Sequence, residues 1–367
     1  MTKKNELETL MGKINKKYGD GTIILGSDYP DLVRVPTGVF SLDVEIGGGV
    51  PKGRIMILTG NESTSKTTVS MKAIAEFQNR CRNCLSKLNE ERKCIMHECE
   101  DGGPHNAMFV DIEGTFDPKW FRALGGNLDE LYLLQPEYTE QACDVIEAVI
   151  RTGDMDIIVV DSIAMMSPAE EIEKSSENML MGVHARLTNR LMRSISSGLN
   201  HLGMANRRKP SIVLINQLRE KVGVMFGSPD VMPGGKGQKF AASITIKFFA
   251  RPSERVNEEA TPKRNVGQLI RFNVEKNKTF PPNRSGTFTL FTDYSLEFGR
   301  EKGEVDNDVQ IVKYGLAYGL ISKNGSWYSY GDVRRQGESG LIDGLIENEL
   351  LDQVKKELVE KILGGLR

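Results

Sequence analysis

The sequence predicts an α/β fold with a mostly parallel central sheet, and two observations lead to this prediction. Short apolar strands alternate with amphipathic helices from Arg54 to Ile215, a pattern typical of right-handed βαβ units. A glycine turn with the sequence GNESTSKTT, residues 60–68, follows the first of these strands and opens a helix. Because ligands of such folds bind beyond the carboxyl ends of the strands, we expect a binding site at this edge of the sheet.

Length, charge and cysteine content narrow the class of protein. The 367 residues are enough for one large domain and one or two small ones. Lys and Arg number 48 against 50 Asp and Glu, so any binding to nucleic acid must come from local patches. A charged N-terminus and the lack of a membrane-length apolar run argue against a signal peptide and a membrane partner, so we expect a cytoplasmic protein. Of the five cysteines, four fall within residues 81–99, which indicates a metal site rather than a disulfide scaffold.

The chain divides into three parts. We expect residues 1–34 to form an arm that packs on its own domain or on a neighbouring subunit. This arm has a predicted helix at Glu6–Tyr18 and a β-like stretch at Thr22–Leu25. We expect residues 35–296 to form the main domain. We expect residues 297–367 to form a small α/β lobe, with a strand-like stretch at Ser326–Tyr330 and a helix at Leu350–Leu363.

The elements of the main domain follow from its apolar pattern. The predicted strands of the parallel part are Arg54–Leu58, Ala107–Ile112, Leu131–Leu134, Asp156–Val160 and Ile212–Ile215, and the helices between them include Thr67–Gln78 and Glu140–Arg151. Three later strands lack long helices between them: Ser243–Phe249, Gln268–Val274 and Thr287–Phe291. We expect these later strands to extend the sheet in antiparallel fashion.

The stretch GNESTSKTT has the composition of a phosphate-binding loop. It consists of Gly60, Asn61, Glu62, Ser63, Thr64, Ser65, Lys66, Thr67 and Thr68. Backbone N–H groups at the helix N-terminus would face an anion, Lys66 would neutralise it, and the Thr67 hydroxyl would ligate Mg²⁺. The consensus GxxxxGK[ST] has glycine where this chain has Ser65, and serine adopts the turn only with a negative φ or with strain.

Two acidic residues at strand ends complete a predicted nucleotide site. Asp161 ends the strand in DIIVVDS, where a carboxylate is well placed to hold the water shell of Mg²⁺ beside Thr67. Glu113 follows the strand in FVDIEGTFDP and could orient or deprotonate a water that attacks the γ-phosphate. The alternative is that Asp111 or Glu113 is only a solvated strand end.

Over nearly its whole length the sequence resembles the RecA family of DNA recombinases. The matching stretches are TGVFSLDVEIGGGVPKGRIMILTGNESTSKTT, FVDIEGTFDP, DIIVVDSIAMMSP, EIEKSSENMLMGVHAR, INQLREKVGVMFGSPDVMPGGKGQKFAAS, VEKNK and GSWYSY. Other ATPases of the superfamily share only the first and third. The resemblance implies a RecA-type P-loop ATPase core with an N-terminal polymerisation arm and a small C-terminal domain.

The resemblance also implies roles for residues around ATP. Lys66, Thr67 and Asp161 would hold ATP and Mg²⁺, and Glu113 would activate water. In INQLR, Gln217 would sense the γ-phosphate and relay the ATP state to the loop that follows. Trp120, after Asp117 in FDPKW, would stack on adenine, although an ordinary core aromatic is an equal alternative for this residue alone. In VEKNK, Lys276 and Lys278 would reach the ATP of the neighbouring subunit, the alternative being a solvated basic strand edge.

Two loops, residues 173–182 and 220–239, would meet single-stranded DNA by the same resemblance. The implied contact residues in and around them are Met181, Arg186, Arg219, Lys221, Met225, Phe226, Lys236 and Lys239. The second loop also has apolar tips between basic flanks, which suits insertion between bases while phosphates are held. Its alternative is simply a long exposed loop.

A cysteine-rich insert, residues 80–106, departs from the family pattern. Cys81, Cys84, Cys94 and Cys99 have a spacing compatible with tetrahedral structural Zn²⁺, and His97 or, less well, His105 could replace one thiolate. Four thiolates leave no open position for catalysis. Reduced, unliganded thiols are the alternative. The insert indicates a divergent family member, for which a viral origin is one interpretation.

The implied function is an ATP-dependent recombinase and DNA-dependent ATPase that needs ATP and Mg²⁺. It would form helical filaments by self-association on single-stranded DNA and pair that DNA with homologous duplex DNA. One alternative is an ATP-binding protein that coats single-stranded DNA and hydrolyses ATP weakly because Ser65 distorts the loop. Another is a ring-forming helicase-type motor, against which the paired DNA loops, VEKNK and the arm all argue.

Overall fold

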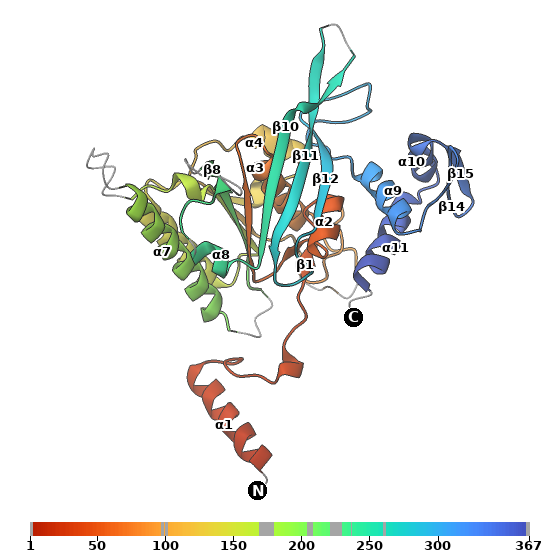
Figure 1. Cartoon of the computed structure of the whole chain (residues 1–367). Coiled ribbons are helices and arrows are strands. Elements are labelled where there is room, and N and C mark those ends of the chain that lie inside the picture. The colour runs from red at the N-terminus through yellow and green to blue at the C-terminus, as the bar shows by residue number, and fades with distance from the viewer. Residues whose placement is uncertain are drawn as a thin grey trace.

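The computed structural model describes residues 3–96, 99, 102–168, 180–203, 208–220, 230–235, 237–259 and 262–364. Its centre is an eight-stranded sheet in the order β12-β11-β10-β3-β7-β6-β4-β5 (Figure 1). These strands are β3 (Ile55–Gly60), β4 (Ala107–Asp111), β5 (Leu131–Leu134), β6 (Ile157–Asp161), β7 (Ser211–Gln217), β10 (Ile244–Glu258), β11 (Arg264–Asn277) and β12 (Ser285–Phe291).

All strands from β10 to β5 in this order run parallel, which confirms the mostly parallel sheet. Within this sheet, as the described residues show it, pairing is antiparallel between β10 and β11 and between β11 and β12. The expectation that all three later strands extend the sheet in antiparallel fashion was therefore wrong for β10, which lies parallel to β3. After β7 the chain returns through the short helix α8 (Gly237–Ala241), so it re-enters the sheet in the same direction.

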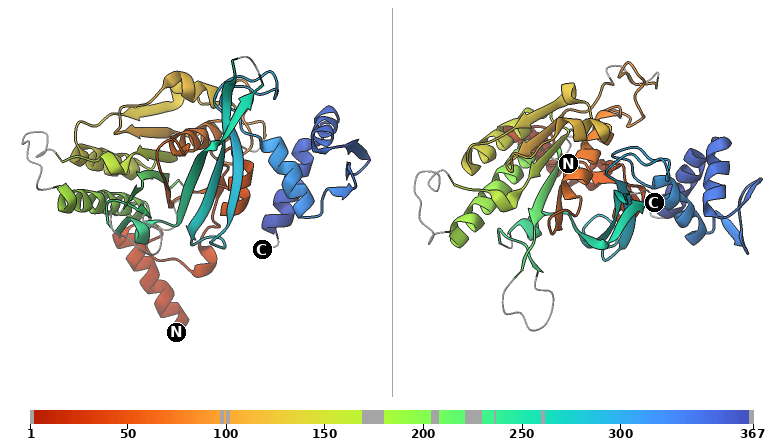
Figure 2. Two further views of the ribbon diagram at one scale, coloured as in Figure 1. Left: turned by 45° about the horizontal axis from the view of Figure 1, so that its top comes forward. Right: turned by 90° about the horizontal axis from the view of Figure 1, so that it is seen from above.

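Helices cover both faces of the sheet (Figure 2), and side chains alternate between the faces as strand geometry requires. In β3, Met56 and Leu58 pack in one core, against α2 (Phe40–Ile46), α3 (Lys66–Gln78) and α4 (Pro118–Ala123). Ile55 and Ile57 of the same strand pack in a second core, against α5 (Thr139–Thr152) and α7 (Leu180–His201). The central strands are thus buried on both faces, which holds their carboxyl ends in fixed positions.

The N-terminal arm begins with α1 (Lys3–Tyr18), which projects away from the sheet (Figure 2). Leu7 and Leu10 on this helix are exposed. The predicted β-like stretch Thr22–Leu25 is not a strand in this chain. Instead, the Asn15 side chain bonds both backbone groups of Ile23, donating to its carbonyl at 3.0 Å and accepting from its N–H at 2.9 Å. These two bonds take the place of a strand partner.

The C-terminal part lies beyond the β12 edge, on the opposite side of the sheet from α7 (Figure 1). Its elements are α9 (Asn307–Ala317), β13 (Ser322–Asn324), β14 (Trp327–Tyr330), β15 (Val333–Gln336), α10 (Glu338–Glu347) and α11 (Leu351–Leu363). They share one small core with Phe40 and Val44 of α2. Because α2 contributes to this core and to the core beside α3, it joins the C-terminal part to the sheet.

The remaining short elements are η1 (Gly26–Asp28), β1 (Arg34–Val35), β2 (Val50–Pro51), η2 (Leu128–Glu130), η3 (Ile163–Met165), β8 (Arg219–Glu220) and β9 (Asp230–Val231). None of the helices in the described ranges combines the length and the apolar character needed to cross a bilayer.

Candidate nucleotide site and cysteine cluster

The phosphate loop connects β3 to α3, as the sequence predicts. Gly60 closes β3 with φ +152°, and a Cβ there would lie 2.5 Å from the carbonyl oxygen of Phe248, so only glycine fits. Ser63 and Ser65 both have left-handed backbone, with φ of 57° and 64°. Ser65 thus adopts the conformation that glycine takes in the consensus loop, at a cost of about 1–3 kcal/mol of local strain.

Lys66 and Thr67 begin α3 and point toward the carboxyl ends of the strands. The Thr67 hydroxyl donates a 2.6 Å hydrogen bond to Oδ2 of Asp161, at the end of β6. Lys66 Nζ donates to the Asn61 carbonyl at 2.6 Å, inside the loop. Burial raises the pKa of Asp161 to about 6, against the opposing effect of the Thr67 bond, and burial lowers the pKa of Lys66. A hydroxyl and a carboxylate in direct contact form the oxygen donor set that Mg²⁺ prefers.

Three strands bring polar side chains together next to this pair. Glu113 follows β4, Ser162 follows β6 and Gln217 ends β7. Ser162 Oγ donates to Glu113 Oε1 at 2.5 Å, and Gln217 Nε2 donates to the same oxygen at 2.9 Å. The expected neighbourhood of Glu113 and Gln217 is thus present, with Ser162 as a third member.

Asp111 serves the turn that carries Glu113 and is not a solvated strand end. Its carboxylate is buried and accepts backbone N–H bonds from Thr115 and Phe116, both at 3.1 Å. Gln135, which follows β5, donates to it as well, at 3.0 Å. The carboxylate therefore fixes the turn between β4 and α4, and with it the position of Glu113.

Trp120 lies on α4, beside the phosphate loop, and Asp117 is the N-cap residue of this helix. The indole Nε1 of Trp120 donates to Thr68 Oγ1 at 3.3 Å, and Lys302 Nζ lies 5.4 Å from the ring centroid. Asp117 is exposed and caps α4, accepting the Lys119 N–H at 2.8 Å. Trp120 is therefore next to the loop, whereas the Asp117 carboxylate is engaged at its own helix end.

Lys276 and Lys278 do not lie with the phosphate loop of their own chain. Thr245 of β10 pairs with Lys276 on one side and with Ile57 of β3 on the other, three residues before Gly60. Lys276 Nζ donates to the Lys239 carbonyl, and Lys278 Nζ donates to the Phe240 carbonyl at 3.0 Å. Both lysines therefore contact α8, away from the ends of the parallel strands that carry the nucleotide residues.

The structure describes part of the predicted DNA-binding set. Met181 and Arg186 lie on α7, where Arg186 is exposed, and Lys239 is exposed on α8. Arg219 begins β8, two residues after Gln217, and β8 pairs with β9 within the second loop. Lys221, Met225, Phe226, Lys236 and most of the first loop lie outside the described residues.

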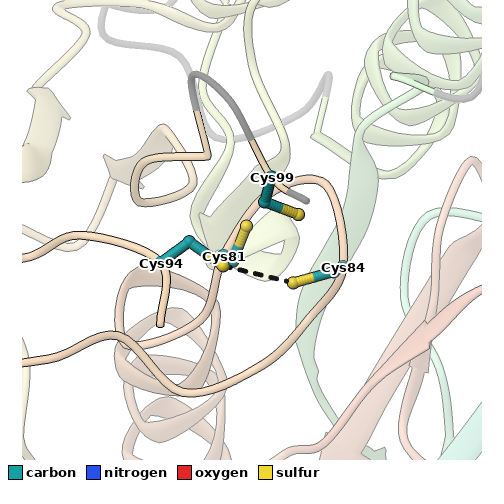
Figure 3. A group of neighbouring side chains, drawn as sticks. All are labelled: Cys81, Cys84, Cys94 and Cys99. Atoms are coloured by element: carbon teal, nitrogen blue, oxygen red, sulfur yellow. Dashed lines mark hydrogen bonds between the residues drawn. The ribbon is translucent and has the colours of Figure 1, made fainter. Parts of the chain in front are cut away.

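The four cysteines of the insert converge on one point, and their thiols face one another (Figure 3). All four Sγ atoms lie within 4.8 Å of one another, and Cys84 and Cys94 are 3.4 Å apart. A Cβ on Gly102 would lie 2.6 Å from Cys81 Sγ, so this glycine leaves room for the cluster. Within the cluster, a hydrogen bond with Ser86 lowers the pKa of Cys84 to about 6, whereas hydrogen bonding to Cys84 raises the pKa of Cys99 to about 12.

His97 and His105 were the two histidines predicted as possible replacements for a cysteine ligand. His97 lies outside the described residues. His105 is fully buried, with Nδ1 3.2 Å from Asp156 Oδ1 and its ring 5.2 Å from that of Phe77. His105 therefore belongs to the base of the insert and not to the cysteine cluster.

Sequence reasoning assigned no role to several residues that organise the site. Ser162 and Gln135 follow strands that were predicted, so a polar residue directly after each strand was a usable signal. Asn216 is less obvious: its side chain donates to the Pro233 carbonyl at 3.1 Å and to Gln238 Oε1 at 2.9 Å. It thereby ties β7 to the later part of the second loop, a contact that no local pattern reveals.

Comparisons with known proteins agree with this geometry. A family profile described as the RecA N-terminal domain matches residues 5–91 and 92–296, and one described as the RecA C-terminal domain matches residues 309–363. Protein RecA of Kineococcus radiotolerans is 36% identical over 366 residues, which cover 98% of this chain and 93% of the relative. Protein RecA of Oceanobacillus iheyensis is 35% identical over 351 residues, covering 95% and 89%. The chain therefore belongs to the RecA family of ATP- and Mg²⁺-dependent DNA recombinases, DNA-dependent ATPases that form helical filaments on single-stranded DNA and pair it with homologous duplex DNA.

Proposed function

We propose that the strand ends gathered around the phosphate loop perform the ATP chemistry of this recombinase, each with a separate role. The observation that carries the proposal is the convergence of Lys66, Thr67, Asp161, Glu113 and Gln217 at the carboxyl ends of β3, β4, β6 and β7. Ligands of parallel α/β sheets bind at that edge. The residues come from segments that are distant in sequence, so a chance cluster of this composition is a weak explanation.

Lys66 and Thr67 would bind the phosphates. Lys66 Nζ bonds the Asn61 carbonyl, from which it can turn to a phosphate oxygen without leaving the loop. Thr67 and Asp161 would hold Mg²⁺, because their 2.6 Å contact places two oxygen donors side by side. When bound, the ion neutralises the negative charge that phosphates carry during transfer.

Glu113 would take the proton from the attacking water. Ser162 and Gln217 both donate to Oε1, and neither bond uses Oε2, so one carboxylate oxygen is oriented while the other can accept a proton. Ser162 and Gln217 act here as positioning residues. Trp120 would stack on adenine, and its bond to Thr68 keeps the ring beside the loop.

Gln217 would also connect ATP to DNA. It ends β7, and only Leu218 separates it from Arg219 of β8, which closes the base of the second loop with β9. A shift of Gln217 toward a γ-phosphate would therefore move that base. Lys276 and Lys278, which donate to carbonyls of α8 at the end of the same loop, would contact the ATP of a neighbouring subunit in the filament.

Residues in and around the second loop would bind single-stranded DNA. Basic residues flank apolar ones in the second loop, and exposed Arg186 and Lys239 lie on the helices at the loop ends. This combination suits a single strand of DNA, because positive charges hold phosphates while apolar tips separate bases.

Residues 1–34 would serve as the polymerisation arm, residues 35–296 as the ATPase core and residues 297–367 as the C-terminal domain.

The cysteine cluster would hold one structural Zn²⁺. Tetrahedral coordination at Zn–S distances of about 2.3 Å separates the sulfurs by roughly 3.8 Å, and the four Sγ atoms lie within 4.8 Å of one another. The insert has little core of its own, since Ile95 and Met96 are exposed. A metal would supply the stability that apolar burial does not.

A separation of binding from hydrolysis tests the assignment of the nucleotide site. We expect Glu113→Gln to form filaments on single-stranded DNA with ATP, seen by electron microscopy, while phosphate release falls by about 10²-fold or more, the range for loss of a general base. The exposed Glu137→Gln is the matched control and should keep normal phosphate release. Normal phosphate release in Glu113→Gln would refute the role of Glu113, and closed rings in place of filaments would contradict the filament assembly.

A further inference from the structure

Arg92 of the cysteine insert contacts the far end of the phosphate-loop helix. α3 ends at Gln78, and Arg92 Nη2 donates to the Gln78 carbonyl at 2.7 Å. Arg92 Nη1 donates to the side chain of Asn79, the C-cap residue, at 2.6 Å, and Nε donates to Glu130 Oε1 at 3.0 Å. One guanidinium therefore joins the insert, the end of α3 and the end of η2.

These contacts suit the end of a helix. The last carbonyls of a helix have no partner within it, and a cation near them also interacts favourably with the helix dipole. The Gln78 side chain adds a second tie, because it donates to the Asn127 carbonyl at 2.8 Å and accepts the Asn127 N–H at 2.9 Å. The C-terminal end of α3 is therefore held against the η2 segment by two independent sets of bonds.

The opposite end of α3 needs such support. Its first turn follows Ser63 and Ser65, both in left-handed conformation. Strained residues of this kind persist only where the surrounding structure fixes them. α3 has 13 residues and is thus about 20 Å long, short enough to transmit a displacement from one end to the other as a rigid rod. A loosened C-terminal end would allow the loop to relax away from the phosphate-binding conformation.

A tight turn connects Arg92 to the cysteine cluster. Arg92 lies in a tight turn in which its N–H donates to the Asn89 carbonyl at 3.0 Å and the Lys93 N–H donates to Asn89 Oδ1 at 2.8 Å. This turn runs directly into Cys94, whose Sγ is 3.4 Å from that of Cys84. A metal held by these thiolates would fix the turn and, with it, the guanidinium.

We propose that the cysteine insert is a metal-dependent clamp on the phosphate-loop helix, with Arg92 as the positioning residue through which metal occupancy sets the affinity for ATP. The proposal rests on the zinc site proposed above. It assigns a regulatory role to a segment whose described residues contribute no side chain to the nucleotide site. Loss of the clamp should weaken ATP binding while the catalytic groups on β4, β6 and β7 stay in place.

The test measures KM for ATP, kcat of DNA-dependent phosphate release and zinc per chain. We expect Arg92→Ala to raise KM about five- to tenfold, the lower part of the range for coupling between two sites, with kcat within about twofold and zinc retained. Arg92→Lys keeps the positive charge but lacks the planar guanidinium that donates to several acceptors at once, so its KM should lie between those of wild type and Arg92→Ala. Lys93→Ala is the matched control, because its ion pair with Glu91 is exposed and touches neither α3 nor the cluster in the described structure.

The metal is tested by a double perturbation. Removal of zinc from the wild-type protein by a chelator should raise KM by a similar factor, and the same treatment of Arg92→Ala should add little, because both changes release the same contact. Fully additive effects would overturn the link between the metal and Arg92. An unchanged KM in Arg92→Ala with normal zinc content would overturn the clamp itself.

Two further outcomes separate this proposal from the zinc site. If wild-type protein purified under reducing conditions contains no zinc, the zinc site and the metal dependence of the clamp both fail, and the KM of Arg92→Ala then decides whether Arg92 still acts as a positioning residue. If Arg92→Ala does not fold, Glu130→Gln replaces it, since this variant keeps Arg92 and every cysteine and removes one ionic partner. Its KM should rise less than that of Arg92→Ala, and no rise would count against the clamp.

Discussion

The two ends of α3 carry sites that are built in opposite ways. At the N-terminal end, the phosphate loop meets residues from β4, β6 and β7 that are up to about 150 positions away in the chain and that two apolar cores hold in register. At the C-terminal end, the four cysteines fall within residues 81–99, and the segment that carries them exposes Ile95 and Met96. The first site depends on the sheet, whereas the second depends on local chain geometry and, as we propose, on a metal.

This difference shows what each site can tolerate. The strained serines of the phosphate loop follow a buried strand, which gives them most of their support, and the proposed Arg92 clamp would add to it from the other end of α3. The insert has no comparable apolar support, so its order should vary with metal and redox conditions. Four variants test this contrast, in order of decreasing expected effect.

Lys66→Ala should have the largest effect. It removes the ammonium that the loop directs at the phosphates, and loss of a preorganised charge of this kind costs about 10²–10³-fold in rate. We expect ATP-dependent strand exchange and phosphate release to fall to background while the circular dichroism spectrum stays native. Lys119→Ala, an exposed lysine of α4, is the control. Strand exchange at wild-type levels in Lys66→Ala would remove the central assignment.

Cys84→Ser should affect the other end of α3. Loss of one thiolate should abolish binding of about one zinc per chain and make the insert sensitive to limited proteolysis, because an unliganded insert lacks a core of its own. The sheet should remain folded. Cys143→Ser, at a buried cysteine of α5 outside the cluster, should keep the zinc. Equal zinc content and equal protease resistance in wild type and Cys84→Ser would show that the cluster is not a metal site.

Trp120→Ala should weaken ATP binding without affecting the cysteine insert. Loss of one stacked aromatic costs about 0.5–1.5 kcal/mol beyond its buried area, so KM for ATP should rise several-fold. Trp120→Phe retains the ring face and loses the bond to Thr68, so its KM should lie close to that of wild type. If both variants have wild-type KM, Trp120 is an ordinary core aromatic.

Ser65→Gly should have the smallest effect and the opposite sign. Glycine accepts a φ of 64° without the steric cost that serine carries, although it loses more entropy on folding. We expect a net gain of about 1 kcal/mol, seen as a rise of roughly 2–4 °C in Tm. Ser63→Gly is the matched comparison, since Ser63 has similar backbone strain outside the lysine-preceding position. A lower Tm in Ser65→Gly would show that the serine side chain stabilises the loop.

Sequence reasoning reached most of the fold because its signals are local. Each of the five strands predicted to be parallel, and the helices α3 and α5, appeared as a run with a strand or helix period, and each lies within a few residues of its predicted bounds. The predicted direction of β10 was wrong because this direction depends on how the chain crosses from β7. The predicted β-like stretch Thr22–Leu25 is not a strand, because a strand also needs a partner strand. The RecA family profiles confirm the resemblance carried by the motifs.

The sequence by itself determined the phosphate loop, the acids at the strand ends and the cysteine spacing, because these are short patterns whose chemistry is written in adjacent residues. Tertiary structure alone decided that Ser162 and Gln217 share one oxygen of Glu113, that Lys276 and Lys278 face away from their own loop, and that Arg92 reaches the end of α3. The physical reason is that such contacts join segments whose proximity follows from sheet order and helix packing, which no local pattern records.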